Sequence, residues 1–94
     1  MPVGVLTLEI QIPYAHSLKE KRAVLRKMKD RLRARFNVAV AELDHQDLWQ
    51  RAAIAAVTVS SDREHAGKVL QSVEDEAAAL LGSELAEATV EWLA

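Results

Sequence analysis

The chain has 94 residues, 50% of them hydrophobic, and its twelve basic and fourteen acidic side chains give a formal net charge of −2. This length is typical of a single domain, here residues 1–94, and the apolar half of the chain is enough to form a core. Because the sequence contains no cysteine, it excludes disulfide bonds, thiolate catalysis and cysteine-ligated metal centres.

The first residues lack the basic and apolar regions of a signal peptide, and no apolar run approaches the ~20 residues that span a bilayer. We therefore expect a soluble cytoplasmic protein with no membrane partner. Charge is unevenly distributed, because residues 1–36 carry nine basic and three acidic side chains, whereas residues 37–94 carry three and eleven. This asymmetry predicts a basic face and an acidic face, unless the two halves neutralise each other across the fold.

An alternating segment from Val3 to Ile12 predicts the first strand. One side of this strand is fully apolar and consists of Leu6, Leu8, Ile10 and Ile12. Pro13 is expected to end the strand and to begin a short connection.

Ser17 and Glu20 form the pattern of a capping box, in which each side chain accepts a hydrogen bond from the backbone N–H of the other residue. A helix is therefore predicted from Leu18 to about Arg35, with Asn37 marking its end. The apolar stripe of this helix consists of Leu18, Val24, Leu25, Met28, Leu32 and Phe36.

The remainder of the chain predicts two strands, a helix and a final strand. The strands span Val38–Leu43, Ala52–Val59 and Leu85–Leu93. Ser60, Ser61 and Asp62 precede the second helix, with Ser61 and Glu64 as a second capping box and Gly82 directly after the helix. The apolar positions of that helix are Ala66, Val69, Leu70, Val73, Ala77, Leu80 and Leu81.

The order βαββαβ predicts a ferredoxin-like α+β sandwich, with a four-stranded antiparallel sheet and two helices on one of its faces. The other face would carry Val3, Val5, Thr7, Glu9 and Gln11 of the first strand, beside one of the two alternating sets of the third strand, each of which is apolar or small. Because an uncovered apolar face favours a second subunit, we expect a homodimer or a higher homo-oligomer, although small alanines on a monomer would also tolerate water.

Basic residues follow one flank of the first predicted helix. At about 100° per residue they lie within roughly 80° of one another, over about 21 Å of helix. This basic stripe consists of Lys19, Arg22, Arg26, Lys29 and Arg33. Like charges at this spacing repel, so the stripe requires either ion pairing, for example with acids of the second helix, or an anionic partner such as RNA, the ribosome or another anion.

RNA-binding domains of this fold stack bases on aromatic residues of the two central strands. The segments 3–12 and 52–59, which would form those strands, contain no Phe, Tyr, Trp or His. RNA binding would therefore use the phosphate groups and the basic stripe, and phosphate contacts position a nucleic acid without specifying its sequence.

The segment between the second and third strands concentrates reactive side chains, namely Asp44, His45, Asp47, Trp49 and Arg51. Two carboxylates and an imidazole suit acid–base chemistry or a metal, but the spacing matches no known motif. We interpret the segment as a structured hairpin that serves as a partner-binding loop, and we predict no metal site, no cofactor and no catalytic residues.

Three blocks of the sequence resemble the YlxP-like family of small bacterial proteins: residues 16–22 (HSLKEKR), 31–38 (RLRARFNV) and 41–52 (AELDHQDLWQRA). The resemblance implies a ferredoxin-like fold and a loose link to ribosome biology, but no activity and no catalytic residues. The leading hypothesis is therefore a non-enzymatic accessory domain that binds RNA or the ribosome through the basic stripe. The alternative is a homo-oligomeric protein-interaction module without a role in nucleic-acid binding.

Overall fold

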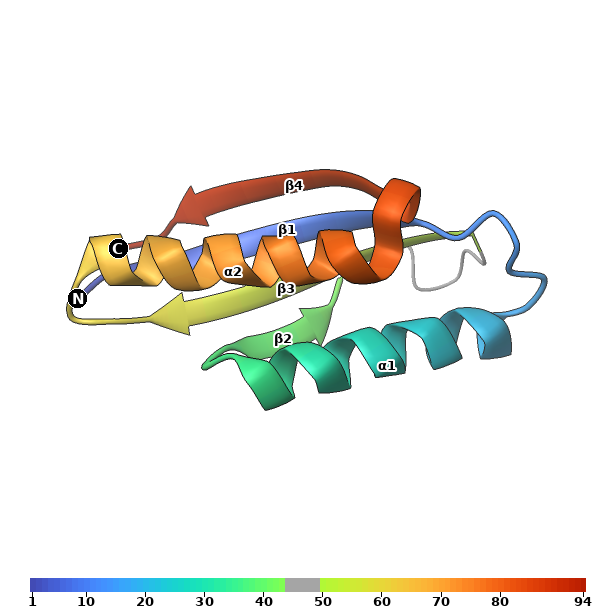
Figure 1. The fold of residues 1–94 in the computed structure, drawn as a ribbon, viewed down its shortest axis with the longest axis horizontal. Coiled ribbons are helices and arrows are strands. Elements are labelled where there is room, and N and C mark those ends of the chain that lie inside the picture. The colour runs from blue at the N-terminus through green and yellow to red at the C-terminus, as the bar shows by residue number, and fades with distance from the viewer. Residues whose placement is uncertain (44–49) are drawn as a thin grey trace.

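A computed structural model describes residues 1–43 and 50–94, and the elements follow the predicted order. The strands are β1 (Val3–Gln11), β2 (Ala39–Glu42), β3 (Arg51–Val59) and β4 (Leu85–Trp92), and the helices are α1 (Leu18–Arg35), α2 (Arg63–Leu81) and the short 3-10 helix η1 (Gly82–Glu84). The strands form one antiparallel sheet in the order β2-β3-β1-β4, and both helices cover the same face of it (Figure 1). The predicted ferredoxin-like fold is confirmed.

The core lies between the helices and one face of the sheet. In the register of the two central strands, Leu6 pairs with Ala56 and Leu8 pairs with Ile54, so the apolar side of β1 faces the helices as predicted. The fully buried large apolar side chains are Leu6, Leu8, Ile10, Ile12, Leu25, Leu32, Ile54, Leu70 and Val73. Burial of each such side chain contributes about 1.5–3 kcal/mol, which makes this layer the main source of stability.

The caps of both helices differ in detail from the prediction. Ser17 Oγ accepts the Glu20 N–H at 3.2 Å, as expected, but Glu20 Oε2 accepts the N–H of His16 at 3.2 Å and not that of Ser17. At α2 the predicted cap Ser61 is wrong, because Asp62 Oδ1 accepts the N–H of Glu64 at 3.2 Å. Asp62 takes this position because it directly precedes the helix, where a carboxylate also interacts favourably with the helix dipole.

The helix ends are governed by two different backbone conformations. α1 ends at Arg35, and Phe36 is extended while its N–H still donates to the Leu32 carbonyl, so Asn37 follows the cap and does not form it. Gly82 has a φ of 58°, a left-handed value that glycine adopts without steric cost, which confirms its predicted position after α2.

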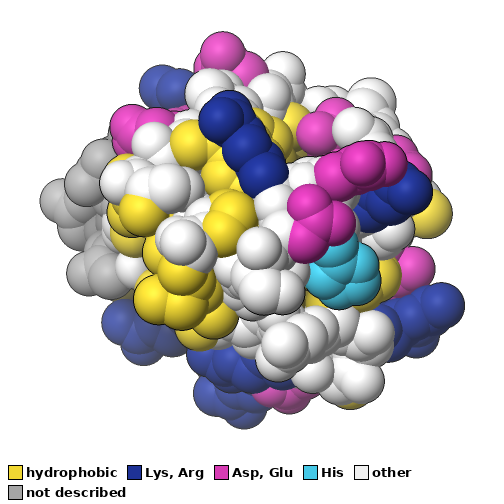
Figure 2. All heavy atoms as spheres, turned by 90° about the vertical axis from the view of Figure 1, so that its left-hand side faces the viewer, with side chains coloured by type: hydrophobic (Ala, Val, Ile, Leu, Met, Phe, Trp, Pro, Cys, Tyr) yellow, Lys and Arg dark blue, Asp and Glu magenta, His cyan; other side chains and the backbone are white. Residues whose placement is uncertain are grey.

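No helix of the described residues covers the opposite face of the sheet, which we call the open face. On it Val3 pairs with Val59, Val5 with Val57 and Thr7 with Ala55. Ala55 is nevertheless buried, because its small side chain lies below those of its neighbours, whereas Val59 is 50% exposed. Figure 2 views the molecule from the end where both chain termini lie, and hydrophobic side chains gather on that surface.

Candidate functional site

The basic stripe lies on a flank of α1 that points away from the core. Lys19, Arg22 and Arg26 are exposed and Lys29 is half-buried, whereas Leu25 on the neighbouring flank is buried. The helical spacing predicted from the sequence therefore places these cations side by side at the surface.

Arg33, the last member of the stripe, contributes to the fold. Its Nη2 donates a hydrogen bond of 2.9 Å to the carbonyl oxygen of Val40 in β2, and its Nη1 lies 3.9 Å from Asp30 Oδ1. The guanidinium thus links the end of α1 to the edge strand, and about half of the side chain remains exposed.

The other four stripe residues have no such partner among the residues that the structure describes. Within residues 1–43 and 50–94, no carboxylate oxygen lies within 4.0 Å of the charged nitrogens of Lys19, Arg22, Arg26 or Lys29. Four adjacent cations therefore form no ion pair with the described part of the chain, and neighbouring members of this set repel one another by a few tenths of a kcal/mol per pair.

A shallow depression of about 460 Å³ lies between α1 and β2. Four stripe residues converge on it, and the lining residues are Arg22, Leu25, Arg26, Lys29, Asp30, Arg33 and Glu42. Four cations and two carboxylates give this depression a net positive charge, so a phosphate group suits it better than a neutral or cationic ligand.

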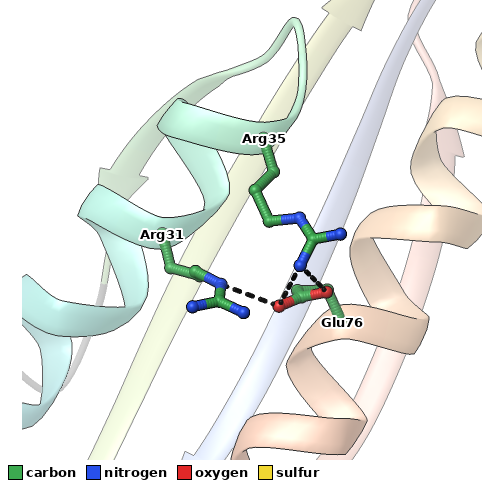
Figure 3. A network of polar contacts seen from close by, with 3 residues as sticks. All are labelled: Arg31, Arg35 and Glu76. Carbon is green, nitrogen blue, oxygen red and sulfur yellow. Dashed lines mark hydrogen bonds and ion pairs between the residues drawn. The ribbon is translucent and has the colours of Figure 1, made fainter.

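Ion pairing between the two helices uses arginines outside the stripe. Arg31 Nε lies 3.0 Å from Glu76 Oε2, and Arg35 Nη1 lies 3.3 Å from Glu76 Oε1 (Figure 3). Both arginines reach from α1 toward a single carboxylate of α2 (Figure 3). The pairing with acids of the second helix that we considered for the stripe therefore involves a different flank of α1.

Sequence analysis missed one lysine that belongs to the interior. Lys21 is 1% exposed, and its Nζ lies 3.9 Å from Glu42 Oε1 of β2. Because a buried ammonium group requires a counter-charge, this pair joins α1 to the edge of the sheet. Lys21 belongs to the same basic segment as the stripe residues, and composition alone gives no signal that separates it from them.

A second hollow, of about 760 Å³, lies between α1 and α2, and we call it the interhelical groove. Tyr14 stands beside Glu84 at one end of it, and the surrounding atoms raise the pKa of the phenol by partial burial, with the nearby Glu84 carboxylate as the second cause. The remaining lining residues come mostly from α1 and are Ala23, Val24, Arg26, Lys27, Met28, Asp30, Arg31, Leu80 and Leu81. Leu80 belongs to the apolar periodicity of α2, but it is 39% exposed and lines this groove.

The predicted partner-binding loop lies mostly outside the described residues, since these exclude Asp44, His45, Asp47 and Trp49. Arg51 is described, and it opens β3 opposite Gln11 with its side chain exposed. In the described ranges, no three His, Asp or Glu side chains are placed to hold a metal ion, and neither helix combines the length and apolar composition that a membrane crossing needs.

The amino-acid sequence matches a family model described as "Protein of unknown function (DUF503)" over residues 3–90. It is also 44% identical over 71 residues to the uncharacterized protein YlxP of Bacillus subtilis (strain 168), which covers 76% of this chain and 77% of the relative. These matches agree with the resemblance carried by the three sequence blocks.

Solved structures share the fold at low sequence identity. Rv0793 from Mycobacterium tuberculosis superimposes with a TM-score of 0.59 at 20% identity, covering 100% of this chain and 94% of its own. A dimeric ferredoxin-like protein of unknown function from Thermobifida fusca superimposes with a TM-score of 0.51 at 16% identity, covering 98% and 91%. At these identities the similarity extends to the fold alone.

Proposed function

The chain belongs to the DUF503 family, and we propose that it is a non-enzymatic accessory protein that binds the phosphate groups of structured RNA or of the ribosome. The description of this family, like that of the relative YlxP, assigns no activity. The observation that carries this proposal is the set of four neighbouring cations on α1 without a carboxylate partner among the described residues. A row of basic side chains on one helix flank matches the regular charge of a nucleic-acid backbone.

Two further features favour phosphate contacts over base recognition. β1 and β3 are the central strands of the sheet, and their segments carry no aromatic ring on which a base would stack. The net charge of −2 also disfavours non-specific binding over the whole surface, so contacts should be confined to α1.

The proposal is tested by measuring affinity for ribosomal subunits and for a structured ribosomal RNA fragment across a salt series. We expect Arg22→Glu and Lys29→Glu to weaken binding and to reduce the slope of log affinity against log salt by about 1 for each lost phosphate contact. Lys68→Glu is the matched control, because it makes the same charge change at an exposed position of α2. If Arg22→Glu and Lys68→Glu bind equally well, or if binding does not depend on salt, α1 is not the phosphate-binding surface.

A second candidate function is self-association through the open face. It rests on the apolar pairs Val3–Val59 and Val5–Val57, which no helix of the described residues covers. The related fold of the Thermobifida fusca protein, which is dimeric, supports an oligomer of this kind. An apolar sheet face that no helix covers commonly marks an interface.

Val59 and Val90 offer a matched test, because both are exposed valines, at 50% and 43%. Val59 lies on the open face, whereas Val90 pairs with Leu6 and therefore lies on the face of the sheet that the helices cover. We expect light scattering to detect an oligomer that Val59→Asp dissociates and Val90→Asp leaves intact, since a carboxylate in an apolar interface is costly to desolvate. A protein that is monomeric at high concentration, or an oligomer that both variants affect equally, would remove this candidate.

A further inference from the structure

The interhelical groove has the composition of a small-molecule site and lies apart from most of the basic stripe. Its volume of about 760 Å³ falls within the range of about 300–1,000 Å³ that is usual for such sites. Its accessible apolar surface comes mostly from Leu80 and the half-buried Val24, whereas Met28 and Leu81 also line the groove but are almost fully buried.

The charges around the interhelical groove differ between its two ends. Arg31 is paired with Glu76 of α2, and Lys27 lies one helical turn before Arg31. Arg26 and Asp30 also line the groove, with opposite charges. Lys27 is exposed and has no carboxylate within 4.0 Å among residues 1–43 and 50–94. At the other end, the Glu84 carboxylate beside Tyr14 repels an anion. An elongated ligand would therefore be oriented with its negative group toward Lys27.

We propose that the interhelical groove binds a free medium-chain organic carboxylate, with its carboxylate at Lys27 and its apolar chain along Val24, Met28 and Leu80. At 1.5 Å per residue, the lining positions of α1 extend about 6 Å from Lys27 to either end, Ala23 or Arg31, so a chain that begins at Lys27 is limited to a medium length such as that of decanoate. The Lys27 ammonium group and the neighbouring apolar side chains favour this amphiphile over an inorganic anion or an uncharged apolar compound.

The experiment is a titration of the isotope-labelled protein with sodium decanoate below its micelle concentration, followed through backbone amide chemical shifts. We expect saturable shifts at Ala23, Lys27 and Leu80, and weaker binding of decan-1-ol, which has the same chain without the charge. Lys27→Glu should weaken decanoate binding about fivefold, which is the upper range for one exposed ion pair. Leu80→Glu should weaken it as well, because it places a carboxylate beside the apolar chain, and it makes few demands on folding since Leu80 is partly exposed.

Arg22→Glu is the control for charge, because Arg22 lines the depression beside β2 and not the interhelical groove. We expect its decanoate affinity to equal that of the unmodified protein. Shifts that concentrate on the open face around Val59, equal binding of decan-1-ol, or equal affinities of Lys27→Glu and Arg22→Glu would each overturn the proposal. The two proposals are tested independently. Loss of RNA binding in Arg22→Glu tests the basic stripe, and loss of decanoate binding in Lys27→Glu tests the interhelical groove.

Discussion

The guanidinium of Arg33 donates a 2.9 Å hydrogen bond to the backbone carbonyl of Val40, and this contact fixes the last turn of α1 to the edge strand β2. β2 is only four residues long and pairs with β3 alone. A short edge strand gains little from its ladder of hydrogen bonds, so contacts from α1 are an important part of what holds it. Arg33 therefore differs in role from the other residues of the basic stripe.

Replacement of Arg33 by alanine should lower stability more than replacement of another stripe residue. We expect Arg33→Ala to reduce the free energy of unfolding by about 1–2 kcal/mol, because a partly buried carbonyl loses its charged donor. Arg22→Ala should change it by less than about 0.5 kcal/mol, as is usual for an exposed side chain. Urea unfolding followed by circular dichroism measures both values, and equal losses in the two variants would contradict the structural role of Arg33.

Loss of the Glu76 carboxylate should loosen the contact between the helices. Glu76→Gln leaves Arg31 and Arg35 without their counter-charge, and we expect a loss of about 1 kcal/mol that shrinks in ~1 M salt. Glu64→Gln, which affects the exposed pair with Lys68, should cost no more than about 0.5 kcal/mol. The comparison is made by urea unfolding at low and high salt. A loss in Glu76→Gln that salt does not alter would show that packing, and not charge, is responsible.

Gly4 and Gly67 should respond oppositely to alanine. A Cβ at Gly4 would lie 2.8 Å from Leu70 Cδ1 and 2.9 Å from Trp92 Cζ3, so we expect Gly4→Ala to destabilise the protein by about 1–3 kcal/mol. A Cβ at Gly67, inside α2, would meet Trp92 at an ordinary 3.9 Å, and the higher helix propensity of alanine should stabilise the protein by about 0.5–1 kcal/mol.

Thermal unfolding of the two glycine variants provides the measurement. Leu70→Val in the Gly4→Ala background removes the δ-methyl groups, one of which is the closest atom, and should therefore recover part of the lost stability. A Gly4→Ala protein as stable as the unmodified chain would show that Leu70 and Trp92 move aside at little cost.

Titration of Tyr14 should show a pKa above the usual value of 10.0. Partial burial is the larger cause and the Glu84 carboxylate the smaller, so Glu84→Gln should lower the pKa part of the way toward 10.0. Tyr14 is the single tyrosine of the sequence, which makes the phenolate absorbance near 295 nm a direct readout.

The same shift makes stability depend on pH in the alkaline range. Because the folded state holds the phenol proton more tightly than the unfolded state, the stabilisation is complete below pH 10 and is lost as the pH rises through the folded pKa. Tyr14→Phe should abolish this part of the alkaline dependence. If it does not, other groups account for the loss of stability at high pH.

The sequence was sufficient to predict the fold because its elements carry strong local signals. The alternation in residues 3–12 predicted which face of β1 is buried, and Ser17 predicted where α1 begins. The predicted cap of α2 differs from the observed one, and the reason is local. Ser60, Ser61 and Asp62 are all good capping residues, and only the backbone path selects Asp62.

The candidate site was only partly predictable, because helical spacing identifies a flank but not its partners. Nine basic residues lie from Lys19 to Arg35, and the helical spacing placed five of them on one flank. It did not reveal that Lys21 enters the interior beside Glu42 or that Arg31 and Arg35 meet Glu76, since both contacts join residues far apart in the chain. Leu80 illustrates the same limit. It continues the apolar periodicity of α2, but at this position α1 does not cover it and the side chain is exposed.

The pairing of Glu76 with two arginines has a consequence for how this protein can change. Glu76 holds α1 against α2 through Arg31 and Arg35, and Arg33 holds the end of α1 against β2, so the exposed positions Lys19, Arg22 and Arg26 contribute little to the placement of the helix. Evolution or design can therefore alter the charge of these exposed positions, and with it the proposed phosphate-binding surface, while the architecture stays intact.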